Sequence, residues 1–305
     1  MFNDRIVLLR SVHEPDNMRP QGTNFSSKFL LKSNGKSLSL ATPVVMGILN
    51  LTPDSFFDGR ELNSAEELLK KADKFLNEGA AILDLGAVSS KPGAAEVSES
   101  EELRRLLPFL KLVRNTFPAV FISVDTFRSS VASAAAECGT DVINDISGGT
   151  ADENMFKVVA AAKRPYIIMH MQGTPQTMQQ NPQYKNVVKE VYNFLKKQSA
   201  KAKKAGIKQI ILDPGFGFGK TVEHNYKLLS QFKKFEKLAC PLLAGISRKS
   251  MINKVLKTAP DKALNGSTVL NTLALLNGAN ILRVHDVKEA VETIKLISVF
   301  KIHSI

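Results

Sequence analysis

The chain has 305 residues, which at about 100–200 residues per domain allows one large domain or two smaller ones. A hydrophobic content of 44%, a charged content of 23% and a mean hydropathy of -0.07 exclude a disordered, collagen-like or disulfide-stapled chain. Lysine and arginine exceed aspartate and glutamate by 41 to 29, and the net charge of +12 favours anionic partners, either nucleic acid or small phosphorylated molecules. A lysine-rich solvated surface would give the same charge.

The cysteine content and the lack of long apolar stretches indicate a compartment. Cys138 and Cys240 are too few for a disulfide framework and lack metal-site spacing, so we expect a reduced, cytoplasmic location. The apolar run Ile6–Leu9 is too short for a signal peptide, and no stretch approaches the ~20 apolar residues of a membrane span. We therefore expect no membrane partner.

The N-terminal part of the sequence predicts two different segments. Residues 1–25 lack periodicity and indicate a mobile N-terminal extension, whereas residues 26–305 are expected to form a single domain. Asn34 and Gly35 lie between apolar residues and predict a β-hairpin over 29–40, because a type I′ turn needs positive φ at both central residues.

From residue 44 onward, short apolar runs alternate with longer amphipathic stretches, which is typical of a parallel sheet covered by helices. The apolar runs are Val44–Leu49, Ala81–Leu85, Val120–Val124, Asp141–Ile143, Tyr166–Met169, Ile210–Leu212, Leu242–Ile246 and Ile281–Val284. The helical stretches include Ala65–Asn77, Ser100–Thr116, Val187–Ala205 and Ser267–Leu276. Eight such units in ~260 residues predict an α/β fold, a (β/α)8 TIM barrel with the N-terminal hairpin under it. A doubly wound sheet is the alternative.

Polar residues follow every one of these apolar runs. They are Asn50, Asp84, Asp125, Asn144 with Asp145, His170, Asp213, Ser247 to Lys249, and Arg283 with His285. In a barrel all eight strand ends meet on one face, and barrel enzymes place their active sites there. The pattern therefore predicts an enzyme.

The strand ends predict an acidic group and a cationic group. Asp84, Asp125, Asp213 and Asn144 would meet with little cationic company and could read the donor edge of a nitrogen-rich heterocycle, such as a 2-amino-4-oxo ring. They could equally be ligands of a hard cation, and Asp84 could cap a helix instead.

The last two units carry the cations. Ser247, Arg248, Lys249, Arg283 and His285 predict a cationic wall suited to a carboxylate or a pyrophosphate.

The glycine-rich segment 213–221 resembles a phosphate-binding P-loop. Gly215 and Gly219 are one residue too close for that motif, however, so we exclude a nucleotide triphosphatase. The glycines would instead let Phe218 approach a flat ligand closely. His170 could be a base or simply a packed histidine.

Two loops rich in small, turn-forming residues, 51–59 and 86–93, follow the first two strands and are expected to close on substrate. Phe56 and Phe57 could cover an aromatic substrate or anchor their loop.

Seven motifs together resemble dihydropteroate synthase, in the family's order and from about residue 28 to the end of the chain. They are Met46–Phe56, Ser123–Thr126, Ile143–Ile146, Met169–Pro175, Asp213–Lys220, Ser247–Ser250 and Arg283–Asp286.

The resemblance implies a cytoplasmic, homodimeric transferase of folate biosynthesis and a sulfonamide target, with residues 26–305 forming one pterin-binding TIM-barrel domain. Such an enzyme condenses 6-hydroxymethyl-7,8-dihydropterin pyrophosphate with p-aminobenzoate to give 7,8-dihydropteroate and pyrophosphate. The family's reaction uses Mg²⁺ and a dissociative step that resembles formation of a pterin cation, so electrostatics and positioning would supply most of the catalysis.

The resemblance also assigns roles by position. The pterin would be bound by Asp125, Asn144, Met169, Asp213, Phe218 and Lys249. The pyrophosphate would be bound by Asn50, which also holds the metal, and by Ser90, Lys91, Arg283 and His285. The p-aminobenzoate pocket would be lined by Phe56, Pro92, Phe218, Lys249 and Ser250. The catalytic groups would be Asp125, Asn144, Asp213, Lys249, Arg283 and His285.

One segment departs from the family pattern. Where the family usually reads Gly-Gly-Glu-Ser-Thr-Arg-Pro-Gly, residues 86–93 read Gly-Ala-Val-Ser-Ser-Lys-Pro-Gly. Val88 lacks the carboxylate, and Lys91 keeps the charge but lacks the bidentate fork. This loop and Phe57 are similar to the sulfonamide-insensitive branch of the family, which leaves the response to sulfonamides open.

Two other functions remain open from the sequence. A pterin-dependent methyltransferase would share the carboxylates but lack the Ser-Arg-Lys-Ser and Arg-x-His motifs, and a non-catalytic pterin-binding paralogue would have lost its second loop. No nucleic-acid module is recognisable, so we expect small-molecule substrates and no nucleic-acid partner.

Overall fold

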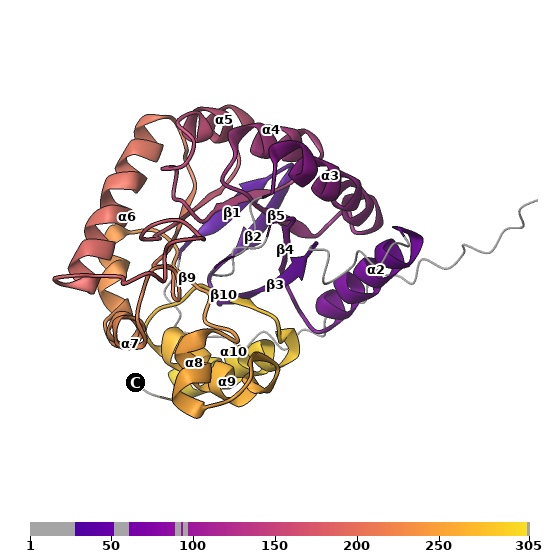
Figure 1. Ribbon diagram of the computed structural model, residues 1–305. Helices are drawn as coiled ribbons and strands as arrows, with labels where there is room; N and C mark the ends of the chain where they lie inside the picture. Colours follow the sequence, from indigo (N-terminus) through magenta and orange to yellow (C-terminus); the bar gives the residue numbers. More distant parts are fainter. Residues whose placement is uncertain (1–27, 52–60, 89–92, 94–96, 304–305) are drawn as a thin grey trace, which may run out of the picture.

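The computed structural model describes residues 28–51, 61–88, 93 and 97–303, with side chains omitted for 61–64 (Figure 1). The predicted extension 1–25 lies outside the described residues. Eight parallel strands follow one another around a barrel. They are β3 (Val44–Asn50), β4 (Ile82–Gly86), β5 (Phe121–Asp125), β6 (Val142–Asp145), β7 (Tyr166–Met169), β8 (Ile210–Asp213), β9 (Leu243–Ala244) and β10 (Ile281–Val284).

The sheet is almost closed on itself. Its strand order is β8-β7-β6-β5-β4-β3-β10-β9, so the two edge strands are β8 and β9. A parallel bridge between Leu212 and Leu242 joins these edges, and the Leu212 N–H donates to Pro241 O at 2.9 Å. This confirms the predicted barrel and excludes the doubly wound sheet. Each of the eight predicted apolar runs overlaps one strand.

Helices form a ring outside the barrel (Figure 1). They are α2 (Glu61–Asn77), α3 (Glu99–Thr116), α4 (Ser129–Glu137), α5 (Met155–Ala162), α6 (Val187–Lys204), α7 (Val222–Ser230), α8 (Ser250–Leu256), α9 (Leu264–Leu276) and α10 (Val287–Ile302). Two short 3₁₀ segments, η1 (Phe232–Leu238) and η2 (Pro260–Lys262), precede β9 and α9. Polar residues start several helices: the Thr221 side chain accepts from His224 N at 3.2 Å and caps α7, directly after the glycine-rich segment.

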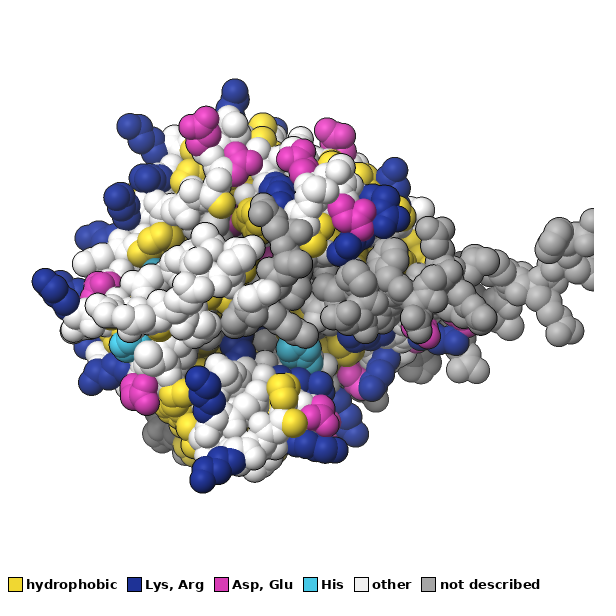
Figure 2. All heavy atoms as spheres, viewed as in Figure 1, with side chains coloured by type: hydrophobic (Ala, Val, Ile, Leu, Met, Phe, Trp, Pro, Cys, Tyr) yellow, Lys and Arg dark blue, Asp and Glu magenta, His cyan; other side chains and the backbone are white. Residues whose placement is uncertain are grey.

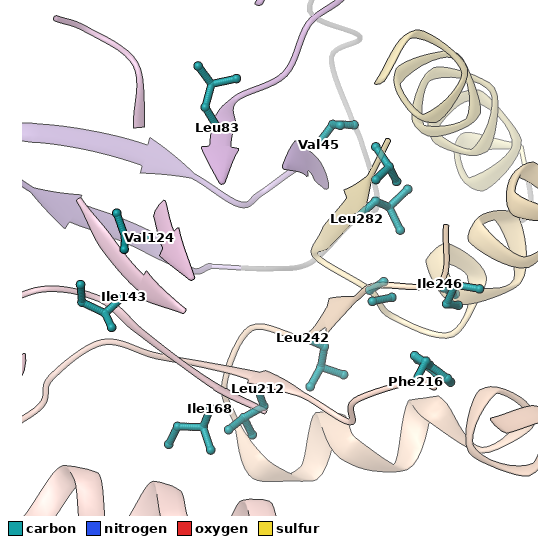
Figure 3. Packing of buried hydrophobic residues seen from close by; sticks show 14 of the residues in the cluster. Val45, Leu83, Val124, Ile143, Ile168, Leu212, Phe216, Leu242, Ile246 and Leu282 are labelled. Atoms are coloured by element: carbon teal, nitrogen blue, oxygen red, sulfur yellow. The ribbon is translucent and has the colours of Figure 1, made fainter. Parts of the chain in front are cut away.

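The outward side chains of the strands pack against these helices. Figure 3 shows one such residue from almost every strand, together with Phe216 and Ile246 from the loops. The strand residues belong to one buried cluster, and they are Val45, Leu83, Val124, Ile143, Ile168, Leu212 and Leu282. Alternate residues of a strand point to opposite faces, so the residues between them point into the barrel.

The inward side chains form an apolar floor near the amino-terminal ends of the strands. The floor consists of Met46, Ile82, Phe121, Val142, Ile167, Ile211, Leu243 and Ile281. Leu31 and Leu40, from the hairpin of β1 (Leu30–Ser33) and β2 (Lys36–Ser39), belong to the same cluster and cover it from below. The predicted position of the hairpin is therefore confirmed, and polar chemistry is confined to the opposite end.

The hairpin is fastened to the barrel by the fully buried carboxylate of Asp141. It accepts hydrogen bonds from Asn34 Nδ2 at 2.9 Å and Lys36 Nζ at 2.7 Å on the hairpin. On the barrel side it accepts from Ile122 N at 2.9 Å and forms an ion pair with Arg114. One carboxylate thus joins the turn of the hairpin to β5 and α3.

Replacing this carboxylate tests its contribution. We expect Asp141→Asn to lower the free energy of unfolding by about 3 kcal/mol, because Lys36 and Arg114 lose their counter-charge in a largely buried place. Urea denaturation measures the loss. Glu66→Gln, which removes an exposed ion pair with Lys70, is the matched control and should leave stability near wild type. A loss below about 1 kcal/mol for Asp141→Asn would contradict the role given to it.

Candidate active site

A cluster of polar side chains lies in the barrel directly above the apolar floor. Because side chains alternate, the second residue after each floor position also points inward, and these residues include Asp84, Ser123, Asn144, Asp213 and Arg283. Two residues after Ser123 and Arg283 come Asp125 and His285, which by the same alternation also point inward. The register sets Asp125 beside Asn144 on adjacent strands. The structure therefore brings together the predicted acidic group.

Arg283 links two of these carboxylates. Its Nε donates to Asp84 Oδ2 at 2.7 Å and its Nη2 donates to Asp125 Oδ2 at 2.9 Å. Asn144 Nδ2 also approaches Asp84 Oδ2, at 3.4 Å. The expectation that the carboxylates have little cationic company is wrong, because an inward-pointing arginine on β10 reaches across the barrel to β4 and β5. Asp84 serves this cluster and not a helix cap.

Arg248 does not belong to the predicted cationic wall. Its guanidinium forms an ion pair with Asp286, the residue that precedes α10, and its backbone has a φ of 58°. Its side chain is therefore neutralised away from Asp84 and Asp125. The sequence could not show this, since Arg248 and Lys249 are neighbours whose side chains leave the backbone in different directions.

Lys249 lies between the acidic cluster and the glycine-rich loop. Its Nζ donates to Phe216 O and lies 4.5 Å from the ring centroid of Phe218. Burial lowers the pKa of Lys249 to about 8, and Asp213 opposes this shift by attraction. The ammonium is thus held where a flat ligand on Phe218 would meet it.

Burial also shifts the pKa values of Asp125 and Asp213. Burial raises the pKa of Asp125 to about 7, although the nearby Arg283 acts in the other direction. Burial likewise raises the pKa of Asp213, opposed by Lys249 and by a hydrogen bond from Gly215 N. Neighbouring cations therefore favour the ionised form of both carboxyls: Arg283 for Asp125, and Lys249, Arg283 and Lys220 for Asp213.

An apolar wall completes the site. Met169 and Phe218, both predicted, pack in one buried cluster with Ile146 and Met178. Sequence reasoning missed the last two residues. Ile146 continues the inward alternation of Val142 and Asn144 and could have been found in that way, whereas Met178 lies in an irregular segment that carries no periodic signal.

His285 faces the site but carries no charge near neutral pH. Burial and the neighbouring Arg283 lower its pKa to about 4, and its Nδ1 lies 3.1 Å from Ser247 Oγ. The predicted cationic wall is therefore reduced to Lys249 and Arg283, with His285 as a neutral hydrogen-bonding group.

The remaining predicted residues lie at the rim or outside the described residues. Asn50 is half-buried at the carboxyl end of β3, and Ser250 is exposed at the start of α8. Phe56, Ser90, Lys91 and Pro92 lie outside the described residues. His170, for which two alternatives were open, is a packed histidine: it is 6% exposed and its ring lies 4.9 Å from that of Phe194.

Within the described part of the chain, no group of three or more His, Cys, Asp or Glu side chains is arranged to hold a metal ion. Nor is any described helix both long and apolar enough to cross a membrane.

A barrel mouth with two buried carboxylates, Asp84 and Asp213, an amide and two cations defines a barrel enzyme that binds a polar, nitrogen-rich substrate. The sequence matches the family described as "Pterin binding enzyme" over residues 46–285, and the chain belongs to that family. It is 45% identical to the dihydropteroate synthase of Escherichia coli (strain K12) over 269 residues, which cover 88% of this chain and 95% of the relative. It is 46% identical to that of Haemophilus influenzae, over 87% of this chain and 97% of the relative.

Solved structures give the same result. The fold resembles Yersinia pestis dihydropteroate synthase in a sulfonamide drug complex, with a TM-score of 0.84 and 40% identity, covering 90% of this chain and 99% of that one. It also resembles Xanthomonas albilineans dihydropteroate synthase with 4-aminobenzoic acid, with a TM-score of 0.83 and 37% identity, covering 89% and 98%. The activity is that of a dihydropteroate synthase, a transferase that joins dihydropterin pyrophosphate to p-aminobenzoate. The paralogue and methyltransferase alternatives are not supported.

The pKa values of Asp125 and Lys249, both shifted by burial, predict a narrow pH optimum for kcat/KM. We expect kcat/KM to fall below about pH 7 as Asp125 is protonated, and to fall above about pH 8 as Lys249 loses its proton. Steady-state rates across the pH range measure both limbs. Lys249→Arg should remove the alkaline limb while the acid limb stays, because a guanidinium does not titrate there. A profile without an acid limb would show that ionised Asp125 is not required.

Proposed function

We propose that the barrel mouth breaks the bond to pyrophosphate before it forms the bond to p-aminobenzoate. The observation that carries this proposal is a set of carboxylates, buried Asp84 and Asp213 with half-buried Asp125, beside an apolar wall. Fixed negative charge in a low-dielectric site stabilises positive charge that develops on a bound pterin as its C–O bond breaks. The bonding electrons leave with pyrophosphate, the amine nitrogen then forms the C–N bond, and the nitrogen loses a proton.

The pterin ring would lie between the polar cluster and the apolar wall. Asp125, Asn144 and Asp213 offer carboxylate and amide groups to its ring nitrogens and amino group, and Lys249 offers a donor to its carbonyl oxygen. Met169 and Phe218 would pack on the face of the ring. The burial of Asn144 and Asp213, each 4% exposed, supports binding deep in the mouth.

Pyrophosphate would lie nearer the rim, against Arg283, His285 and Asn50. A guanidinium has five N–H donors, and Arg283 uses one at Nε and one at Nη2 for Asp84 and Asp125. It can therefore donate to an anion without releasing either carboxylate. Ser90 and Lys91 are proposed to contact the same anion from the second loop.

Mg²⁺ fits this arrangement as an ion held mainly by the substrate. Asn50 presents a hard amide oxygen at the end of β3, and the described residues offer no group of three or more His, Cys, Asp or Glu ligands. Mg²⁺ commonly binds to one or two protein oxygens, substrate phosphates and water. When bound, it would neutralise charge on the departing pyrophosphate.

p-Aminobenzoate would enter beside the pterin. Lys249 and Ser250 would face its carboxylate and Phe218 its ring, with Phe56 and Pro92 proposed to complete the pocket. The Yersinia pestis relative was solved with a sulfonamide drug, which supports the proposal that this chain too is a sulfonamide target.

We propose further that the chain forms a homodimer and acts in the cytoplasm. Apolar side chains on α9 and α10, two helices that pack on each other, are exposed: Val269, Leu273, Leu276, Leu296 and Val299. Such a patch is typical of an interaction surface, and a second copy of the chain would bury it. Both cysteines are free thiols, which agrees with a reducing compartment.

Pyrophosphate release tests the activity. The wild-type chain should release pyrophosphate from dihydropterin pyrophosphate and form dihydropteroate only when p-aminobenzoate and Mg²⁺ are both present. Lys249→Ala should lower turnover at least about 100-fold, because it removes the charge beside Asp213 and the donor to the ligand. Thr268→Ala, on the outer helix α9, is a control that should turn over normally. Pterin binding without any turnover would contradict the proposed reaction.

The association state tests the apolar face. Leu273→Glu combined with Leu296→Glu should convert a dimer to a monomer in light scattering, because two charges would be buried in the interface. Leu30→Glu, at an exposed position of the hairpin, should leave the mass unchanged. A wild-type monomer at micromolar concentration would contradict the proposed dimer.

A further inference from the structure

The glycine-rich loop has an unusual pattern of hydrogen bonds. Every backbone carbonyl from residue 215 to residue 219 accepts a hydrogen bond from a side chain. In chain order the donors are Lys220 to Gly215 at 2.8 Å, Lys249 to Phe216, Gln179 to Gly217 at 2.6 Å, Lys220 to Phe218 at 2.9 Å, and Tyr184 to Gly219 at 2.8 Å. Side chains therefore decide the path of this loop, since it forms no regular secondary structure.

Lys220 donates to two of these five carbonyls, more than any other side chain. Besides the two carbonyls of the loop, its Nζ lies 3.0 Å from His170 Nδ1 and 3.2 Å from His170 O. Burial lowers the pKa of Lys220, and even as an ammonium its Nζ has only three donors, so four acceptors use all of its capacity. The residue is 2% exposed, and no carboxylate among the described residues forms an ion pair with it. This lysine therefore has nothing left for a phosphate, which agrees with excluding the P-loop.

The loop lies directly on the segment that follows β7. A Cβ at Gly215 would come within 1.9 Å of His170 O, and one at Gly219 within 2.5 Å of Gln172 O. Both glycines have positive φ, 71° and 62°, so a side chain at either position would be strained and would clash. Lys220 Nζ lies in this contact and bonds to both sides of it.

His170 acts as the fixed acceptor on the other side. Burial lowers the pKa of His170 to about 2, and the charge of Lys220 adds to this, so the imidazole is neutral. Lys220 Nζ lies 3.0 Å from Nδ1, and an Nδ1 that accepts from this lysine leaves the imidazole proton on Nε2. The ring is held in place by Phe194 and Tyr184.

We propose that Lys220, with His170 as its acceptor, is a positioning residue for the pterin pocket. It fixes the loop so that the Phe218 ring lines the pocket and the Phe216 carbonyl receives Lys249, the two groups that meet the ligand. Lys220 itself touches neither substrate. The inference rests on the proposed function, because it assigns the pocket to a pterin.

The test compares Lys220 and Lys36, two lysines whose ammonium groups donate to buried acceptors at opposite ends of the barrel. Lys220→Met removes the donor to three carbonyls, and Lys36→Met removes the donor to Asp141 under the barrel floor. Both should lower the thermal midpoint. Only Lys220→Met should weaken binding of 6-hydroxymethylpterin, followed by pterin fluorescence, by about tenfold or more, and raise KM for dihydropterin pyrophosphate by a similar factor.

A second pair of variants applies if Lys220→Met does not fold. His170→Asn keeps an acceptor oxygen close to the place of Nδ1 and should bind the pterin nearly as well as wild type. His170→Leu removes the acceptor and should weaken binding as Lys220→Met does. A stability loss without rescue of pterin affinity by asparagine would overturn the positioning role.

The outcomes separate the two proposals. A wild-type chain that binds no pterin refutes the proposed function and this inference with it. If wild type binds and turns over, but folded Lys220→Met binds the pterin as tightly as Lys36→Met does, the proposed function stands. In that case Lys220 contributes only stability, and the positioning role is wrong.

Discussion

The Arg283 guanidinium sits inside the barrel and holds Asp84 and Asp125 on two of its edges. Carboxylates this close in a low-dielectric interior would otherwise repel one another and take up protons. With the cation between them, an acidic mouth is compatible with a stable fold. The same guanidinium has further N–H donors that an anion can use, so in the proposed function one side chain serves folding, pterin recognition and pyrophosphate binding together.

The rest of the barrel keeps this cluster in place by dividing its interior into layers. The apolar floor and the hairpin close the amino-terminal end, and the Asp141 carboxylate fastens that closure. Above the floor, the same alternation of side chains brings polar groups inward from different strands. The glycine-rich loop then supplies Phe218 and the acceptor for Lys249, and buried Lys220 holds that loop. Stability and chemistry thus occupy opposite ends of one structure. Figure 1 views that structure along the barrel, and Figure 2 shows the same face with Lys and Arg side chains spread around its periphery.

Several features of the site could be predicted only in part. The sequence placed Asp125, Asn144, Asp213 and Lys249 on one face, because each lies at or after the carboxyl end of a strand and all strand ends of a barrel meet there. It could not show which cation pairs with which carboxylate. Arg283 pairs with Asp84 and Asp125, whereas Arg248 pairs with Asp286, although both lie near the carboxyl end of a strand. His285 counts as a cation by residue type, but burial makes it neutral.

By itself, the sequence determined the order of strands and helices and the hairpin turn at Asn34 and Gly35. It also determined the family motifs and the location of the site at the carboxyl ends of the strands. These features depend on periodicity, turn residues and short-range spacing, which are local properties of a chain. Only the tertiary structure decided the closure of the sheet between β8 and β9, the ion pairs of Arg283, the neutral state of His285 and the use of Lys220 by backbone carbonyls. Those features depend on distances between residues far apart in the chain and on burial, and neither exists before the barrel closes.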